Sequence, residues 1–180
     1  MDVTPELVLS YDCPTEGYLC PLSANTAGIE FLKFEVRDYD TQEVVYQVQR
    51  DSDPEPIPDD LDPEIENLIR SVKYTFPSAF LSFRTVRTAL EFGVGPAPVN
   101  NFRMIERHYF QNKLVRSYDF TFGFCIPSST NSWEAIYDVP ENSPEEIAQY
   151  TGSPYAHKSD SFYFADNKLI MHNKAEYQYT

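Results

Sequence analysis

A glutamate and a histidine two positions apart, Glu106 and His108, have the clearest chemical potential in this sequence. On a β-strand this spacing puts both side chains on the same face. Such a pair can act as general acid and base, close an internal ion pair with an arginine such as Arg84, or accept a hydrogen bond from a ligand. A carboxylate that faces an apolar interior is costly without a donor, so it needs an internal cation or a ligand.

Other catalytic or metal-binding patterns are missing from the sequence. No nucleophile or second carboxylate stands at a telling spacing from the pair, and no phosphate loop, dinucleotide fingerprint or nucleophile elbow occurs. The three histidines and three cysteines lack metal-ligand spacing. We therefore expect no catalytic residue, no metal and no cofactor, and an enzyme is the least favoured class. Cys13, Cys20 and Cys125 are expected to be unpaired thiols in a reducing compartment.

The Glu106 and His108 pair lies in the first arm of a predicted β-hairpin. Segments 99–110 and 114–127 are rich in β-branched and aromatic residues, and residues 111–113 form a polar break between them. One face of the second arm carries a row of four aromatic side chains, Tyr118, Phe120, Phe122 and Phe124. A row of this kind is expected to face a core.

Charge decides between two registers of this hairpin. A loop of three residues, 111–113, sets Glu106 and His108 on the face of the aromatic row. A loop of two residues, 112–113, would set Glu106 opposite Asp119, a like-charge pair that destabilises a sheet. We therefore predict the three-residue loop, which turns the glutamate and the histidine toward an aromatic interior.

The rest of the chain predicts further strands and a few short helices. Alternating or apolar runs indicate strands at 29–37, 44–49, 72–76, 79–86, 89–94, 161–164 and 168–171, the last prolonged at 175–179. Capping patterns at Thr4, Asp62 and Ser143, each followed by proline, predict two or three short helices. Residues 51–63 are expected to form a long surface excursion, and 127–132 a loop. About nine strands with short turns indicate an all-β protein, an antiparallel β-sandwich.

Composition restricts the partners and the interior. The chain has 180 residues and a net charge of −14, which argues against binding to nucleic acid or to anionic membranes. No stretch resembles a signal peptide or reaches transmembrane length, so we expect a soluble cytosolic protein without stable membrane insertion. With 13 Phe and 13 Tyr but only 6 Gly, large rings have few small partners. We therefore expect a cavity between the sheets, the alternative being a solid structural scaffold.

Four longer motifs resemble a known family. Residues 99–110, 122–129, 160–164 and 171–174 are similar to the uncoordinated-type (Unc) acyl-binding chaperones, the myristoyl-binding branch of the phosphodiesterase delta-subunit family. The similarity runs from about Leu19 to Tyr179. It divides the chain into a short, partly ordered N-terminal segment, 1–18, and a single lipid-binding domain, 19–180.

The resemblance implies an immunoglobulin-like β-sandwich whose sheets part to admit a fatty acyl chain. Members of the family solubilise N-myristoylated proteins by binding their acylated N-termini, carry them through the cytosol to destinations such as the cilium or flagellum, and release them when a GTP-bound Arf-like GTPase binds. The resemblance therefore implies a monomeric chaperone with these partners. Within the same superfamily, a prenyl-binding solubilising factor is the alternative.

The resemblance also implies site residues. Those that match the family's pocket are Phe34, Tyr74, Phe80, Glu106, His108 and Tyr163, and the aromatic row adds Tyr118, Phe120 and Phe122. In this role Glu106 accepts hydrogen bonds from the amides at the start of the acylated peptide. The sequence departs from the family at Val139, where relatives place a phenylalanine, and at 51–62, which is acidic where relatives are basic.

Overall fold

Two β-sheets face each other in the computed structural model, which describes residues 2–51, 57–58 and 60–180. The described strands are β1 Glu30–Asp38, β2 Val44–Gln49, β3 Ser71–Phe76, β4 Thr85–Gly93, β5 Val99–Phe110, β6 Lys113–Cys125, β7 Thr130–Asp138, β8 His157–Ala165 and β9 Lys168–Tyr179. The described helices are α1 Pro5–Leu9, α2 Pro63–Ile69 and α3 Pro144–Gly152, with 3₁₀ turns η1 Leu22–Ala24 and η2 Ser78–Ser82. The predicted β-sandwich is confirmed.

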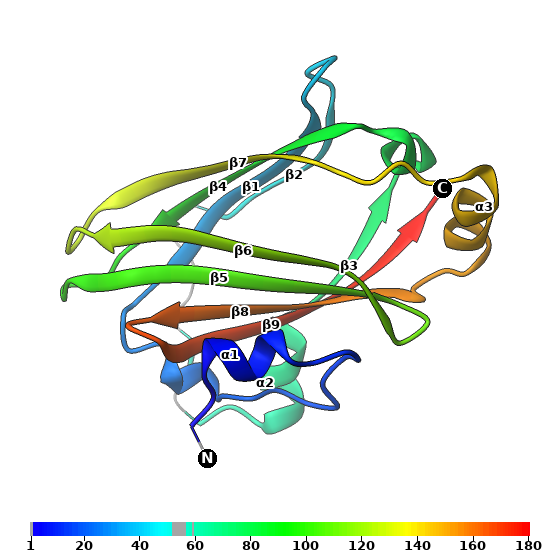
Figure 1. Cartoon of the computed structure of the whole chain (residues 1–180). Helices are drawn as coiled ribbons and strands as arrows, with labels where there is room; N and C mark the ends of the chain where they lie inside the picture. The colour runs from blue at the N-terminus through cyan, green and yellow to red at the C-terminus, as the bar shows by residue number, and fades with distance from the viewer. Residues whose placement is uncertain (1, 52–56, 59) are drawn as a thin grey trace.

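One sheet has the strand order β2-β1-β4-β7 and the other β3-β9-β8-β5-β6. They form the upper and lower layers in Figure 1. Neighbouring strands are antiparallel except for β3 and β9, so the predicted antiparallel sandwich contains one parallel pair. Strands β2 and β3 lie at the edges of their sheets, and so do β6 and β7.

The predicted helix caps are confirmed. Thr4 Oγ1 accepts a hydrogen bond from the Leu7 N–H at 3.2 Å, and Asp62 caps α2 in the same way. At α3, Ser143 and Glu146 satisfy each other's backbone N–H groups in a capping box. Each helix begins with proline after its cap, because proline's fixed φ suits the first turn and its missing N–H has no partner to lose there.

Two strand predictions were wrong. Residues 79–86 and 89–94 do not form separate strands: Ser78–Ser82 is a 3₁₀ turn, closed by a Phe80 N–H bond to the Pro77 carbonyl, and a single strand follows from Thr85. The loop predicted at 127–132 ends early, because β7 begins at Thr130. The predicted excursion at 51–63 lies partly outside the described residues.

The turn of the central hairpin is shorter than predicted, but Glu106 and His108 point to the predicted side of the sheet. Gln111 and Asn112 alone form the turn, with φ of 49° and 63°, and Phe110 pairs with Lys113. These angles suit a tight two-residue turn. A bulge after His108 adds one residue to β6, so Glu106 still pairs with Tyr118 and not with Asp119. The predicted loop length was wrong, and the predicted register at Glu106 is confirmed.

A second irregularity displaces the end of the aromatic row. Gly123 has φ +97°, a conformation that side-chain-bearing residues rarely adopt, and the pairing of β5 with β6 shifts beside it. Beyond this point the faces of β6 exchange. Phe124 is 57% exposed whereas Cys125 is buried, so the inward facing predicted for Phe124 was wrong.

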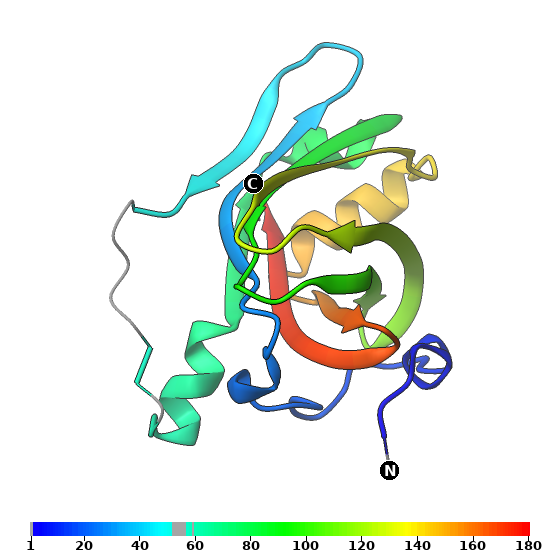
Figure 2. The same ribbon diagram turned by 90° about the vertical axis from the view of Figure 1, so that its left-hand side faces the viewer.

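The N-terminal segment covers the outer face of the β8 and β9 sheet. Figure 2 shows α1 and the segment after it outside this curved sheet. Val8 is fully buried there, in a cluster with Ile105 and Phe162. Phe162 therefore belongs to this outer cluster and not to the interior between the sheets.

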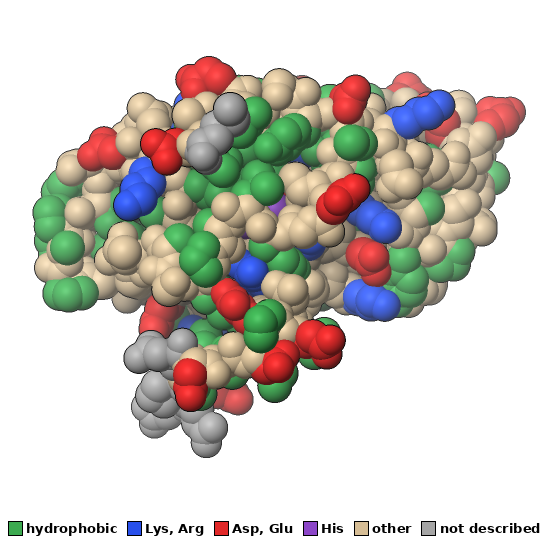
Figure 3. Space-filling model, turned by 90° about the horizontal axis from the view of Figure 1, so that it is seen from below, with side chains coloured by type: hydrophobic (Ala, Val, Ile, Leu, Met, Phe, Trp, Pro, Cys, Tyr) green, Lys and Arg blue, Asp and Glu red, His purple; other side chains and the backbone are tan. Residues whose placement is uncertain are grey.

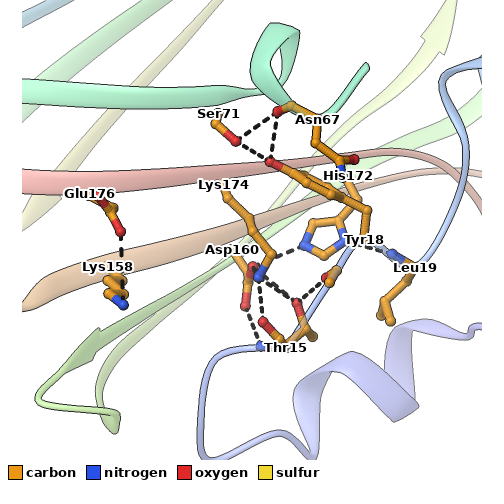
Figure 4. A network of polar contacts seen from close by, with 11 residues as sticks. Thr15, Tyr18, Leu19, Asn67, Ser71, Lys158, Asp160, His172, Lys174 and Glu176 are labelled. Carbon is orange, nitrogen blue, oxygen red and sulfur yellow. Dashed lines mark hydrogen bonds and ion pairs between the residues drawn. The ribbon is translucent and has the colours of Figure 1, made fainter. Parts of the chain in front are cut away.

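Polar contacts around Asp160 fix the same segment (Figure 4). Asp160 is 1% exposed and accepts hydrogen bonds from the Thr15 N–H at 3.0 Å, His172 Nε2 at 2.9 Å and Lys174 Nζ at 2.8 Å. His172 Nδ1 in turn accepts from the Leu19 N–H at 3.0 Å, which leaves the ring proton on Nε2. The segment is thus tied to β8 and β9 by a satisfied buried network.

Candidate functional site

A cavity of about 350 Å³ lies between the two sheets, within the size range of small-molecule sites. Strands of both sheets contribute side chains to its wall. From the first sheet these include Phe31, Phe34, Val36, Leu90, Trp133 and Tyr137, and from the second Tyr74, Met104, Phe120, Tyr163, Tyr177 and Tyr179. The predicted cavity is confirmed, and the two layers do not pack as a solid core.

The cavity opens between the edge strands β2 and β3, beside α2. Three apolar residues that line it are exposed: Val48 (47%), Ile69 (46%) and Val72 (37%). Figure 3 shows hydrophobic side chains gathered on the face seen from below, with acidic side chains beside them. An apolar opening of this kind suits an apolar ligand that enters from solvent.

Aromatic rings close the opposite edge. Tyr118 of β6 and Tyr137 of β7 lie with ring centroids 4.7 Å apart, and Phe120 lies 6.0 Å from Tyr137. These are favourable distances for aromatic pairs. The edge strands β6 and β7 are therefore sealed by side chains where β2 and β3 leave an opening.

All but one of the sequence-predicted site residues line this cavity. Those that do are Phe34, Tyr74, Phe80, Glu106, His108, Tyr118, Phe120 and Tyr163. Phe122 does not, and packs against Phe92 and Trp133 with centroids 5.2 and 5.5 Å away. Phe122 therefore lies in the core beside the cavity, and its role in the site stays a prediction.

A chain of hydrogen bonds runs along the polar part of the wall. Glu106 Oε1 lies 2.6 Å from His108 Nε2, and His108 Nδ1 lies 2.9 Å from His157 Nε2. His157 Nδ1 lies 2.6 Å from the Tyr179 hydroxyl. Four side chains from β5, β8 and β9 are thus connected in one line.

Glu106 has a different internal partner from the arginine considered in the sequence. Arg84 is exposed, whereas the carboxylate of Glu106 is bonded to His108. The sequence also missed His157, Tyr177 and Tyr179. A signal for His157 was present, because every second residue from there to Tyr163 lines the cavity.

Burial governs the protonation of this wall. It is the main reason why the pKa of His157 lies well below its ordinary value, and the neighbouring His108 lowers it further. Burial likewise raises the pKa of Tyr74, Tyr163 and Tyr179, and the charge of Glu106 adds to the shift of the first two. At neutral pH His157 is therefore neutral, and these phenols keep their protons.

Arg116 brings a cation to the cavity wall, directly across the hairpin from His108. Its Nη2 lies 3.5 Å from Asn142 Oδ1, and the part of the chain that the structure describes contains no ion pair of this residue. Arg116 also lowers the pKa of Tyr118, although burial has the larger effect and raises it. The wall thus presents a carboxylate, Glu106, opposite Tyr118 on β5 and a guanidinium two residues from Tyr118 on β6.

The described residues contain neither a metal-binding cluster nor a membrane-spanning helix. They contain no group of three or more His, Cys, Asp or Glu side chains arranged to hold a metal ion. None of their helices has the length and apolar character that crossing a membrane requires.

The sequence is similar to a known family over most of its length. The family model described as "GMP-PDE, delta subunit" matches residues 23–179. The chain is 47% identical to Protein unc-119 homolog B of Danio rerio, over 99% of this chain and 74% of that protein. It is 47% identical to Protein unc-119 homolog B of Homo sapiens, over 98% and 72%, and 44% identical to Protein unc-119 of Caenorhabditis briggsae, over 98% and 80%. The chain therefore belongs to the GMP-PDE delta-subunit family, together with the unc-119 proteins.

Proposed function

We propose that the protein is a lipid-binding chaperone that holds the acyl chain of N-myristoylated proteins in its cavity and carries them through the cytoplasm. The observation that carries this proposal is an open apolar cavity with a hydrogen-bonded carboxylate, Glu106, in its wall. Membership of the GMP-PDE delta-subunit family supports lipid binding and protein traffic as its general role, and a binding protein in preference to an enzyme.

The apolar wall supplies the driving force. A myristoyl chain has about twelve methylenes, and burial at roughly 0.8 kcal/mol each contributes on the order of 10 kcal/mol before the costs of association. A single myristoyl anchor holds a protein on a membrane only weakly and reversibly. A cavity of this kind can therefore compete with the bilayer for a singly acylated protein.

The polar wall supplies selectivity. An N-acylated peptide begins with amide N–H groups, and a carboxylate in a partly desolvated place accepts such donors strongly. Glu106 is suited to this role because much of the wall is apolar, and the nearby phenols of Tyr74 and Tyr163 are un-ionised. Close approach of the peptide backbone to Glu106 also favours small residues after the acylated glycine.

Titration of matched peptides tests the proposal. The same peptide is prepared with an N-myristoyl group, with a C-terminal farnesyl group and unmodified, and each is titrated by fluorescence anisotropy. We expect tight binding of the myristoylated form, at least tenfold weaker binding of the farnesylated form, and none of the unmodified form. Preference for the farnesylated peptide would instead favour a prenyl-binding factor. If neither lipidated peptide binds, the protein is better described as a structural scaffold.

We further propose that a GTP-bound Arf-like GTPase releases the cargo, with the cilium or flagellum as one destination. This step rests on the family resemblance. A GTPase that binds a narrower form of the cavity more tightly must weaken lipid binding by the same factor. Stopped-flow release of a labelled myristoyl peptide, with a panel of such GTPases in GTP and GDP forms, tests it. Release rates that do not change with any GTP-bound member would contradict this part.

A further inference from the structure

We propose that His157 and Tyr179 are positioning residues for the ligand-binding carboxylate. Through His108 they hold one oxygen of Glu106 and leave the other free to accept an N–H from the ligand. They have this role only if the cavity binds acylated peptides, as proposed above. The ligands that profit from it are acyl chains joined to their cargo by an amide.

The geometry is a continuous chain of short contacts. The three contacts measure 2.6, 2.9 and 2.6 Å from Glu106 through His108 and His157 to Tyr179. His108, His157 and Tyr179 are all at least nine-tenths buried, whereas the Glu106 side chain is 23% exposed. The chain thus begins in the protein interior and ends at the carboxylate in the cavity wall.

Counting protons fixes the direction of this chain. Each contact holds one hydrogen. If Tyr179 donates to His157 Nδ1, the proton of His157 is on Nε2 and is donated to His108 Nδ1. The proton of His108 is then on Nε2 and is donated to Glu106 Oε1.

The reverse direction fails with neutral rings. A proton on His157 Nδ1 would leave its Nε2 as an acceptor, so His108 would carry its proton on Nδ1. Its Nε2 lone pair would then face the Glu106 carboxylate at 2.6 Å, which is repulsive. The chain that runs from the Tyr179 hydroxyl to Glu106 is therefore the one in which every contact holds a hydrogen and the carboxylate receives a donor.

This arrangement divides the two oxygens of Glu106. Oε1 is engaged by His108, and no hydrogen bond of Oε2 is found within the described residues. A ligand N–H can therefore bond Oε2 without displacing a protein donor. Without Tyr179 or His157 the chain loses a donor, so the His108 ring, and with it the Glu106 carboxylate, is held less firmly in this orientation.

Tyr177 provides a matched control. Its ring lines the same cavity and stacks on His157 at 4.3 Å between centroids, but its hydroxyl bonds Ser159 Oγ at 3.0 Å and is not part of the chain. Loss of this hydroxyl should alter general packing as much as loss of the Tyr179 hydroxyl. It should not alter the orientation of Glu106.

The test compares two ligands with the same acyl chain. A myristoylated glycine peptide offers an amide N–H, and methyl myristate offers none. Tyr179→Phe should weaken peptide binding about threefold to tenfold, the equivalent of one hydrogen bond, and change ester binding less than twofold. His157→Phe should do the same, whereas Tyr177→Phe should change both ligands alike. In a Glu106→Gln background, Tyr179→Phe should leave the ratio of peptide to ester affinity unchanged, because coupled residues are not additive.

Other outcomes overturn the inference. Equal losses for peptide and ester in Tyr179→Phe would show a packing role only. If the wild type binds both ligands equally, the carboxylate does not recognise the N–H, although acyl binding itself stands. If the wild type binds neither, the proposed function and this inference fall together. The ¹⁵N chemical shifts of the wild-type imidazoles should show Nε2–H tautomers at His108 and His157, and an Nδ1–H tautomer at either would refute the chain whatever the variants do.

Discussion

His108 Nδ1 and His157 Nε2 lie 2.9 Å apart in the wall of the cavity, and both rings are buried. Only one hydrogen fits between them, so these two nitrogens cannot both be protonated. Burial lowers the pKa of His157, and a charge on His108 would lower it further. His157 is therefore neutral at physiological pH.

The first prediction concerns stability in mild acid. The pKa values of His157 and His172 are both lowered in the folded state, mainly by burial. Below about pH 6.5 the unfolded chain binds protons that the folded chain does not, so stability falls as pH falls. Each histidine should remove up to about 1.4 kcal/mol per pH unit until its folded pKa is reached. Urea unfolding at pH 7.0, 6.0 and 5.0 measures this loss.

A histidine variant and an aspartate serve as controls for this slope. His157→Gln should remove at least half of the loss between pH 6.5 and 5, because its pKa is lowered more strongly than that of His172. Asp160 does not contribute there: hydrogen bonds from His172 and Lys174 outweigh burial and keep its pKa low, so its contribution is lost only below about pH 4. Stability that does not change between pH 7 and 5 would mean that these histidines take up protons without unfolding.

The second prediction concerns the carboxylate itself. Glu106→Gln keeps an oxygen that can accept from His108 but turns an amide NH₂ toward the ligand's N–H groups. Binding of a myristoylated peptide should weaken about tenfold or more, while binding of free myristate should stay equal or improve because a like charge is removed. Isothermal titration of both ligands measures the two effects. Glu134→Gln is the control, because Glu134 pairs with Arg87 on the outer face of the first sheet.

If Glu106→Gln binds the myristoylated peptide as tightly as the wild type and the Glu134→Gln control do, this prediction is contradicted. It would show that the carboxylate only completes the hydrogen-bond chain with His108.

The third prediction separates wall from core. Phe80 lines the cavity and is half-buried, so Phe80→Glu should abolish lipid binding while circular dichroism shows a folded protein. Phe122 packs against Phe92 and Trp133, so Phe122→Ala should cost about 3 kcal/mol of stability and affect binding far less. If Phe80→Glu unfolds and Phe122→Ala does not, the two assignments are reversed.

Local rules predicted much of the fold. The caps at Thr4, Asp62 and Ser143 depend on a few neighbouring residues, and each begins a helix as expected. The register of the hairpin was predicted because the repulsion between Glu106 and Asp119 acts whichever turn is used. The length of the turn was not predicted. The actual turn is one residue shorter, and the bulge that restores the register at Glu106 leaves no mark in the alternation of side chains.

The site could be predicted only in part. Glu106 and His108 are neighbours on one strand, so their shared face follows from spacing. His157 and Tyr179 are 49 and 71 residues from His108 along the chain and reach it only through the pairing of β5 with β8 and β8 with β9. No spacing rule covers such pairs, and Arg84 was therefore considered as the partner of Glu106.

The last prediction concerns the network that holds the N-terminal segment. Asp160 bonds the Thr15 N–H through Oδ2, and Asp160→Asn would turn an NH₂ donor toward an N–H donor or toward Lys174. Because a buried ion pair loses one partner, we expect a loss of about 3 kcal/mol in stability. Hydrogen exchange should rise at the amides of residues 15–19, which measures local release of the segment.

The affinity for the myristoylated peptide should change by less than about threefold in Asp160→Asn. Asp160 lies between Ser159 and Ser161, which line the cavity, so its side chain points to the opposite face of β8. Asp119→Asn is the control, because Asp119 pairs with Arg103 at a more exposed site and its loss should cost under about 1 kcal/mol. If residues 15–19 keep their protection in Asp160→Asn, apolar packing around Val8 must hold the segment without the polar network.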